Sequence, residues 1–147
     1  MSKFAVMSRF LSIDYGTVRV GLAVTDPLQI IATGLATVPT NDIFSFLTDY
    51  MAKEKIEGIV VGEPRNLKNK FDEMAAPTIA FIDKLQKFFP SVPVYRVDER
   101  FTSRMALRAM IDGGMKKTKR RDKGLVDKIS ATLILQTFME MKLKGER

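Results

Sequence analysis

Asp14 is the residue whose position most directly suggests chemistry. It ends the apolar run of residues 10–13 and is followed at once by a Tyr-Gly-Thr turn and a second strand-like run. A carboxylate at the carboxyl end of a buried strand is costly to desolvate unless a metal or another cation compensates its charge. The pattern of strand, carboxylate, tight turn and strand therefore predicts a site for metal-dependent phosphate chemistry.

Other acidic residues stand at the ends of predicted elements. Glu63 follows a glycine-bounded apolar run, Asp98 and Glu99 end a later strand, and Asp127 lies in the predicted first turn of the last helix. Ligands gather outside the carboxyl ends of strands in open α/β sheets. Close carboxylates repel one another unless divalent cations bridge them, and two ions about 4 Å apart could hydrolyse a phosphodiester. In isolation, each residue also fits a structural role, as a turn, an ion-paired loop or a helix N-terminal charge.

The composition narrows the chemistry further. The chain of 147 residues has no cysteine and no histidine. This excludes disulfides, thiol nucleophiles, His/Cys zinc sites and a Ser-His-Asp triad. Catalysis would depend on carboxylates together with a hard ion such as Mg²⁺ or Mn²⁺ held by oxygen ligands.

The net charge of +7 is unevenly distributed. Residues 116–123 contain one acidic and six basic residues: Lys116, Lys117, Lys119, Arg120, Arg121 and Lys123. Such a localised basic segment predicts a polyanionic partner such as nucleic acid. The alternative is a solvated loop with no partner.

The apolar patterning predicts elements in the order βββαβαβαα. Strands are expected at residues 9–13, 18–25, 35–38, 58–62 and 94–97. Helices are expected from a cap at Asn41 or Asp42 to residue 55, at 78–89, from Thr102 or Ser103 to 111, and at 125–141. An antiparallel meander followed by parallel strands with helical connections gives a mixed α/β sheet with helices on both faces.

The last predicted helix directs Asp127 inward. Helical spacing puts Asp127 on one face with Ala131, Ile134, Phe138 and Met141, so its carboxylate would point toward the sheet.

No apolar run approaches the ~20 residues that cross a bilayer, and the N-terminus lacks the apolar core of a signal peptide. We expect one domain, residues 1–147, in the cytoplasm.

Four motifs together resemble those of the YqgF/RuvX family, described as Holliday junction resolvases and as pre-16S rRNA nucleases. They occupy residues 13–21, 60–64 and 97–103, and Val126-Asp127 with Ser130-Ala131, within a resemblance that spans residues 10–138. The resemblance implies a ribonuclease H-like five-stranded sheet and a divalent-metal nuclease acting on structured nucleic acid. It assigns catalysis and metal binding to Asp14, Glu99 and Asp127. Glu63 stands where a carboxylate often joins such a site and is a further candidate ligand.

Several arginines lie near the proposed site edge. They are Arg19, Arg65, Arg100 and Arg104. A guanidinium binds phosphate through two parallel hydrogen bonds, so these residues could hold the substrate. The alternative is an ion pair with the same carboxylates. The basic segment would contact the nucleic-acid backbone and give affinity without sequence readout.

Other functions remain open at this stage. Residues 14–17 are also similar to the phosphate loop of the actin/hexokinase superfamily, although those proteins pair two related domains around a nucleotide. A non-catalytic RNA-binding factor for ribosome assembly could keep the same fold. Within the nuclease interpretation, the resemblance favours 5′-end processing of pre-16S rRNA over junction resolution, which requires a dimer. We expect a monomer or a weak homodimer.

Overall fold

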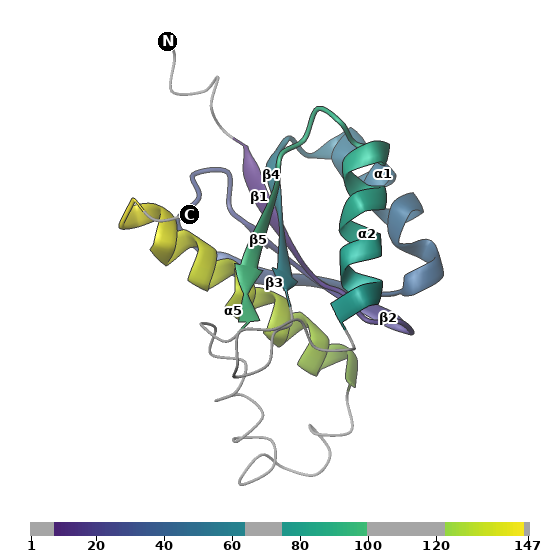
Figure 1. Ribbon diagram of the computed structural model, residues 1–147. Helices are drawn as coiled ribbons and strands as arrows, with labels where there is room; N and C mark the ends of the chain where they lie inside the picture. The colour runs from purple at the N-terminus through teal and green to yellow at the C-terminus, as the bar shows by residue number, and fades with distance from the viewer. Residues whose placement is uncertain (1–7, 64–74, 100–122, 146–147) are drawn as a thin grey trace, which may run out of the picture.

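The computed structural model describes residues 8–63, 75–99 and 123–145 (Figure 1). Five strands form one sheet: β1 (Arg9–Asp14), β2 (Arg19–Thr25), β3 (Ala32–Pro39), β4 (Ile56–Glu63) and β5 (Val94–Asp98). Their order across the sheet is β3-β2-β1-β4-β5. The first three strands pair antiparallel, and β1, β4 and β5 run parallel, so the predicted mixed sheet is confirmed.

Helices cover both faces of this sheet, as predicted. A 3-10 turn, η2 (Thr40–Asp42), leads into α1 (Ile43–Lys53), and α2 (Ala75–Phe88) lies between β4 and β5 in the chain. These two helices lie on one face, and α5 (Lys123–Leu143) crosses the other (Figure 1). The helix expected from Thr102 or Ser103 lies outside the described residues. No helix within the described ranges is long and apolar enough to cross a membrane.

Several element boundaries differ from the sequence prediction, two of them at candidate site residues. β4 continues to Glu63, which was expected in a loop, because Glu63 pairs in register with Asp98 of β5. α5 begins at Lys123, so Asp127 lies beyond the first helical turn rather than in it. Asp42 is the N-cap of α1 but makes no side-chain capping bond, since η2 leads into the helix instead.

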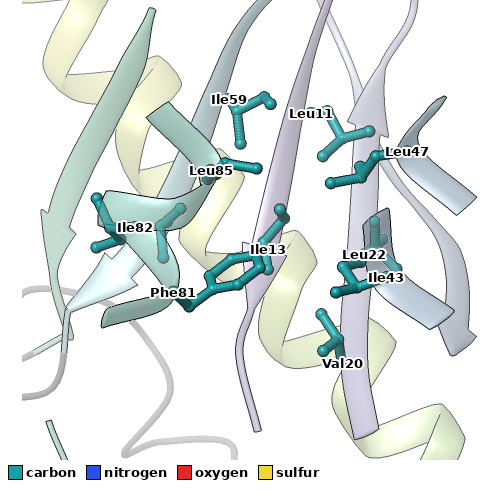
Figure 2. Close-up of a cluster of buried hydrophobic side chains, with 11 residues drawn as sticks. Leu11, Ile13, Val20, Leu22, Ile43, Leu47, Ile59, Phe81, Ile82 and Leu85 are labelled. Atoms are coloured by element: carbon teal, nitrogen blue, oxygen red, sulfur yellow. The ribbon is translucent and has the colours of Figure 1, made fainter. Parts of the chain in front are cut away.

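Strand alternation divides the buried side chains into two clusters. The cluster under α1 and α2 (Figure 2) consists of Leu11, Ile13, Val20, Leu22, Ile43, Leu47, Ile59, Val61, Phe81, Ile82 and Leu85. The cluster under α5 consists of Phe10, Ala23, Val60, Val97, Ala131, Ile134, Leu135 and Phe138. Successive side chains of a strand point to opposite faces, so the even-numbered residues of β1, including Asp14, face α5.

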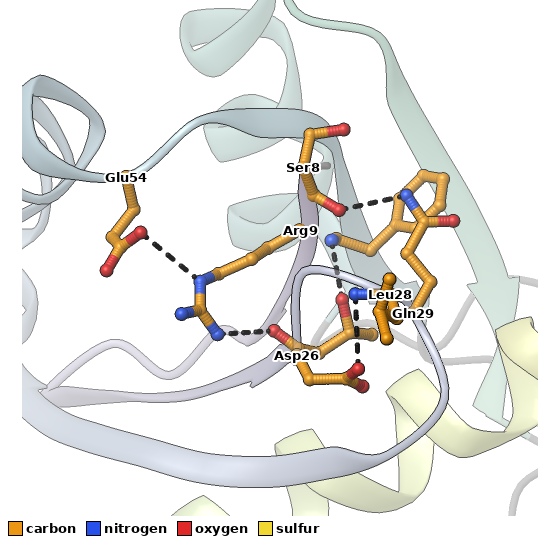
Figure 3. A network of polar contacts seen from close by, with 8 residues as sticks. Ser8, Arg9, Asp26, Leu28, Gln29 and Glu54 are labelled. Carbon is orange, nitrogen blue, oxygen red and sulfur yellow. Dashed lines mark hydrogen bonds and ion pairs between the residues drawn. The ribbon is translucent and has the colours of Figure 1, made fainter. Parts of the chain in front are cut away.

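The connection between β2 and β3 is held in shape by Asp26 (Figure 3). Its carboxylate accepts hydrogen bonds from the backbone N–H groups of Leu28 at 3.1 Å, and of Ile30 and Ile31 at 2.7 Å each. The N–H of Ile31 is the main cause that lowers the pKa of Asp26. Gln29 adopts a left-handed backbone conformation with φ 59°. This loop lies at the end of the sheet opposite the carboxyl end of β1.

Candidate active site

Asp14 lies between two glycines of the neighbouring strands. It is 7% exposed and pairs in register with Gly21 of β2. On its other side, β1 and β4 pair Ile13 with Val61, and continuing that register by one residue puts Gly62 beside Asp14. A row of glycine, aspartate and glycine therefore crosses three strands on the face that α5 covers.

Gly21 allows α5 to approach the sheet beside Asp14. A Cβ atom added at Gly21 would lie 2.9 Å from the Cβ of Asp127 and closer still to the Asp127 carbonyl. Real Cβ atoms do not come this close, so a larger residue at position 21 would push the helix away. Asp127 thus lies over one end of the row because position 21 has no side chain.

Gly62 makes the same kind of space at the other end of the row. An added Cβ would lie 2.7 Å from Oε1 of Glu99 and 2.6 Å from Cδ1 of Ile134. Glu99 follows β5, in which Val97 belongs to the cluster under α5. Its carboxylate therefore lies over Gly62, on the same face as Asp14. The structure thus brings Asp14, Glu99 and Asp127 to one edge of one face.

Two side-chain hydrogen bonds fix α5 above this row. The buried Ser12 donates from Oγ to the carbonyl of Ala131 at 2.6 Å. Thr37 of β3 donates from Oγ1 to the carbonyl of Gly124, also at 2.6 Å. The first bond lies two residues before Asp14 on β1 and one helical turn after Asp127 on α5, so it holds this part of α5 against the strand that carries Asp14.

Arg19 pairs with Asp127. Its Nε atom donates to Oδ2 of Asp127, and the two side chains are 37% and 18% exposed. This is the ion-pair alternative that the sequence left open for Arg19. Within the described ranges, no group of three or more acidic side chains is arranged to hold a metal ion. Asp127 has its carboxylate directed to Arg19.

Glu63 lies on the opposite face of the sheet. Ile59 and Val61 belong to the cluster under α1 and α2, so alternation directs Glu63 to that face as well. Its side chain is 5% exposed and its Oε2 lies 3.9 Å from Nη1 of Arg96. The structure therefore does not bring Glu63 together with the other three carboxylates.

Most of the remaining predicted site residues lie outside the part of the chain that the structure describes. Those outside the described residues are Arg65, Arg100, Arg104, Lys116, Lys117, Lys119, Arg120 and Arg121. Lys123 is the first residue of α5. Gly21, Gly62 and Ser12 were not among the site residues predicted from the sequence. The recurrence of glycine in the motifs with Asp14 and Glu63 was the signal that could have identified the first two.

The sequence of the chain matches a known protein family. A family described as "RuvX: Holliday junction resolvase" matches residues 8–141. A "Putative pre-16S rRNA nuclease" of Flavobacterium johnsoniae is 49% identical over 92% of this chain and 99% of its own length. A protein of the same name from Christiangramia forsetii is 53% identical over 90% of this chain and 98% of its own.

A solved structure has the same fold. "T. thermophilus RuvC in complex with Holliday junction substrate" superposes with a TM-score of 0.57. The two sequences are 18% identical, and the match covers 92% of this chain and 96% of the other. At this identity the likeness shows the fold alone, and it confirms the predicted ribonuclease H-like, RuvC-like architecture.

Proposed function

The chain belongs to the RuvX family, and from that premise we propose that it is a metal-dependent nuclease that processes the 5′ end of pre-16S rRNA. The observation that carries this proposal is the row of Gly21, Asp14 and Gly62 with the carboxylates of Asp127 and Glu99 above its two ends. Gly21 lets α5 bring Asp127 close to the sheet, and Gly62 leaves room for the Glu99 carboxylate, so both acidic residues come close to the buried Asp14.

We propose Mg²⁺ or Mn²⁺ as the cofactor. Asp14, Glu99 and Asp127 would supply carboxylate oxygens, which hard divalent cations prefer. The missing side chain at Gly62 leaves space for the Glu99 carboxylate, and the one at Gly21 lets the backbone of α5 at Asp127 approach the sheet. When the cation binds, the carboxylate of Asp127 would leave its ion pair with Arg19 and bind the cation instead. When bound, such an ion would activate a water molecule and stabilise the charge that develops on the phosphate.

The residues of the chain have separate tasks in this mechanism. Asp14 is held by a central strand, so its carboxylate would fix the position of the cation against the sheet. Arg19 lies beside Asp127, partly exposed, and would donate to a phosphate oxygen once Asp127 binds the cation. The basic segment of residues 116–123 would hold the backbone of the substrate.

The substrate follows from the names of the relatives. Proteins about half identical to this chain over nearly their whole length are named pre-16S rRNA nucleases, which favours ribosomal RNA. Processing of that RNA would place the protein in the cytoplasm. The second candidate is a four-way DNA junction, which the family description names. A two-fold symmetric junction would require a second copy of the chain.

The test is cleavage by the Asp14→Asn variant. With Mn²⁺ present, wild type should cut pre-16S rRNA, and Asp14→Asn should lose at least about 100-fold in rate, since even outer-shell partners of a metal contribute 10- to 100-fold. Asp49→Asn, the same change on the exposed surface of α1, is the matched control. A four-way junction is assayed in parallel to separate the two substrates.

Two results would contradict the proposal. Undiminished cleavage by Asp14→Asn would remove Asp14 from the mechanism. No cleavage by wild type, with wild type and variant binding RNA equally, would indicate a non-catalytic assembly factor.

Calorimetric Mn²⁺ titration of Glu63→Gln decides whether Glu63 is a metal ligand. Weaker binding would make it a ligand, and unchanged binding would leave three ligands.

A further inference from the structure

A pocket of about 600 Å³ lies on the face opposite the carboxylates but at the same edge of the sheet. Its wall begins at Tyr15, the residue directly after Asp14, and continues over the start of α1 and one side of α2. Asp14 faces α5, whereas Tyr15 packs against the cluster under α1 and α2. Thr40 also lines the pocket and donates from Oγ1 to the carbonyl of Gly16 at 2.6 Å, which ties the turn after Asp14 to the pocket wall.

One wall of the pocket is aromatic. Tyr15 stacks on Phe81 with ring centroids 4.4 Å apart and an interplanar angle of 19°. Phe44 lies 5.7 Å from the same Phe81 ring. All three rings line the pocket, and Phe81 is buried whereas Tyr15 and Phe44 are partly exposed. Aromatic rings at a pocket surface suit a flat ligand such as a nucleobase, because every base can stack on them.

The rim of the pocket is cationic. Lys84 and Lys87 are exposed on α2 and line the pocket, and the Lys84 ammonium lies 5.9 Å from the centroid of the Phe44 ring. Lys87 pairs with Asp83 at 3.3 Å in an exposed ion pair, which solvent screens. Two lysines against one aspartate leave the rim positive. The ligand chemistry that matches both features is a planar ring joined to a phosphate.

We propose that this pocket binds one unpaired nucleotide of the strand whose phosphodiester lies at Asp14. The base stacks against Tyr15 and Phe44, and the adjoining phosphate contacts Lys84 or Lys87. The inference rests on the proposed nuclease function and adds a preference for single strands at the cleavage site. A paired base could enter the pocket only by leaving its stack, which costs free energy that an unpaired base does not spend.

The first test removes the cationic rim without touching the core. The double variant Lys84→Gln/Lys87→Gln is compared with Lys53→Gln/Lys144→Gln, which removes the same charge from exposed positions outside the pocket. Fluorescence anisotropy measures binding of a short single-stranded RNA and of duplex RNA over a range of salt concentrations. For the single strand, the pocket variant should lose about 0.7 of the salt slope for each lost phosphate contact, beyond any loss in the control. On duplex RNA, the control variant and the pocket variant should bind with the same affinity and the same salt slope.

The second test removes the aromatic surface. Phe44→Leu should weaken single-strand binding by up to about 150-fold, the upper end of the range expected for one base stacked on one ring. Phe46→Leu, on the same helix but outside the pocket, is the matched control. Phe44 also packs against Phe88 and Phe89, so each variant is checked by its melting temperature. If Phe44→Leu does not fold, the lysine variants decide.

Crosslinking locates the nucleotide directly. Wild type is irradiated with single-stranded RNA containing 4-thiouridine, and the modified peptides are identified by mass spectrometry. Crosslinks at Tyr15 or Phe44 support the pocket. A DNA strand of the same sequence shows whether the ribose hydroxyl contributes, since equal binding would assign recognition to base and phosphate alone.

The outcomes separate this inference from the proposed function. If the pocket variants bind single strands as their controls do, the inference is wrong, and the cleavage test with Asp14→Asn is unaffected. If the pocket variants lose single-strand binding but wild type cuts no RNA, the pocket is a nucleotide site and the nuclease proposal is wrong.

Discussion

Two glycines control how close acidic side chains can come to Asp14. Gly21 lies under the Asp127 backbone, and Gly62 lies under the Glu99 carboxylate. A methyl group at Gly21 would meet the backbone of α5, and one at Gly62 would meet the ends of the Glu99 and Ile134 side chains. At this scale the site depends on residues that take no part in chemistry themselves.

Gly62→Ala tests this dependence. The new methyl group would lie 2.7 Å from Glu99 Oε1 and should displace that carboxylate, lowering cleavage by about 100-fold, the cost of a misplacement near 1 Å. Crowding against Ile134 should also cost about 1–3 kcal/mol of unfolding free energy, measured by urea denaturation. Gly34→Ala is the control, because its nearest neighbour, the Cβ of Lys128, would be 3.3 Å away. Full activity in Gly62→Ala would mean that catalysis does not need Glu99 where the structure has it.

The positions of the acidic residues within the elements could be predicted from the sequence better than the orientation of their side chains. Asp14, Glu99 and Asp127 were named from element ends and from a family resemblance, and the structure brings them to one edge. The face occupied by Glu63 could not be predicted, because it depends on Glu63 being the last residue of β4 rather than the first of a loop. The choice of partner for Arg19 depended on a helix 108 residues away in the chain.

The helices differ in how they are attached to the sheet. α5 packs against all five strands and is bonded to β1 through Ser12 and to β3 through Thr37. The backbone of α1 comes close to β3 and that of α2 to β4 and β5, so each of these helices has fewer neighbouring strands than α5. The carboxylates therefore lie under the most widely supported helix, whereas the pocket lies between the two helices with fewer strand partners.

Native-state hydrogen exchange should reveal this difference. Amides in the middle of α5 should exchange only when the whole protein unfolds, whereas α1 and α2 should also exchange through local opening. We expect opening free energies at least about 1.4 kcal/mol lower in α1 and α2 than in α5, which is a tenfold faster exchange. Amides of β1 provide the internal reference for global unfolding. Equal protection of all three helices would show that they unfold together.

Element types were predictable from sequence, and element lengths were less so. Periodicity identified all five strands and the three described helices. β3 was predicted as residues 35–38 but spans Ala32–Pro39, because the additional residues gain their structure from pairing with β2. A strand that depends on a partner strand has little local signal, especially when it contains Gly34 and several exposed residues.

At the scale of the whole molecule, the edge of the sheet at Asp14 has a candidate site on each of its two faces. The carboxylates lie on the α5 face and the pocket on the α1/α2 face, and Asp14 and Tyr15, which belong to one each, are consecutive in the chain. A single strand could pass around this edge and contact both. The net charge of +7 favours such a substrate as a whole.

Neutralising the basic segment tests its contribution to this attraction. Changing Lys116, Lys117, Lys119, Arg120 and Arg121 to glutamine should weaken RNA binding and reduce the salt slope by about 2 to 3, if most of these residues contact phosphates. The measurement is the dissociation constant over a range of salt concentrations, with Lys53→Gln/Lys144→Gln as the control. An unchanged slope would identify the segment as a solvated loop.

That residues 1–147 form one domain also stays a prediction.

The length of α5 has a practical consequence for optical measurements. Sixteen residues separate Asp127 from Leu143, the last residue of the helix, which puts them about 24 Å apart at 1.5 Å per residue. The natural sequence has no cysteine, so one introduced at the exposed Lys144 would be the sole thiol available to a maleimide dye. A fluorophore there would report on a labelled RNA by energy transfer while leaving the edge of the sheet at Asp14 uncovered.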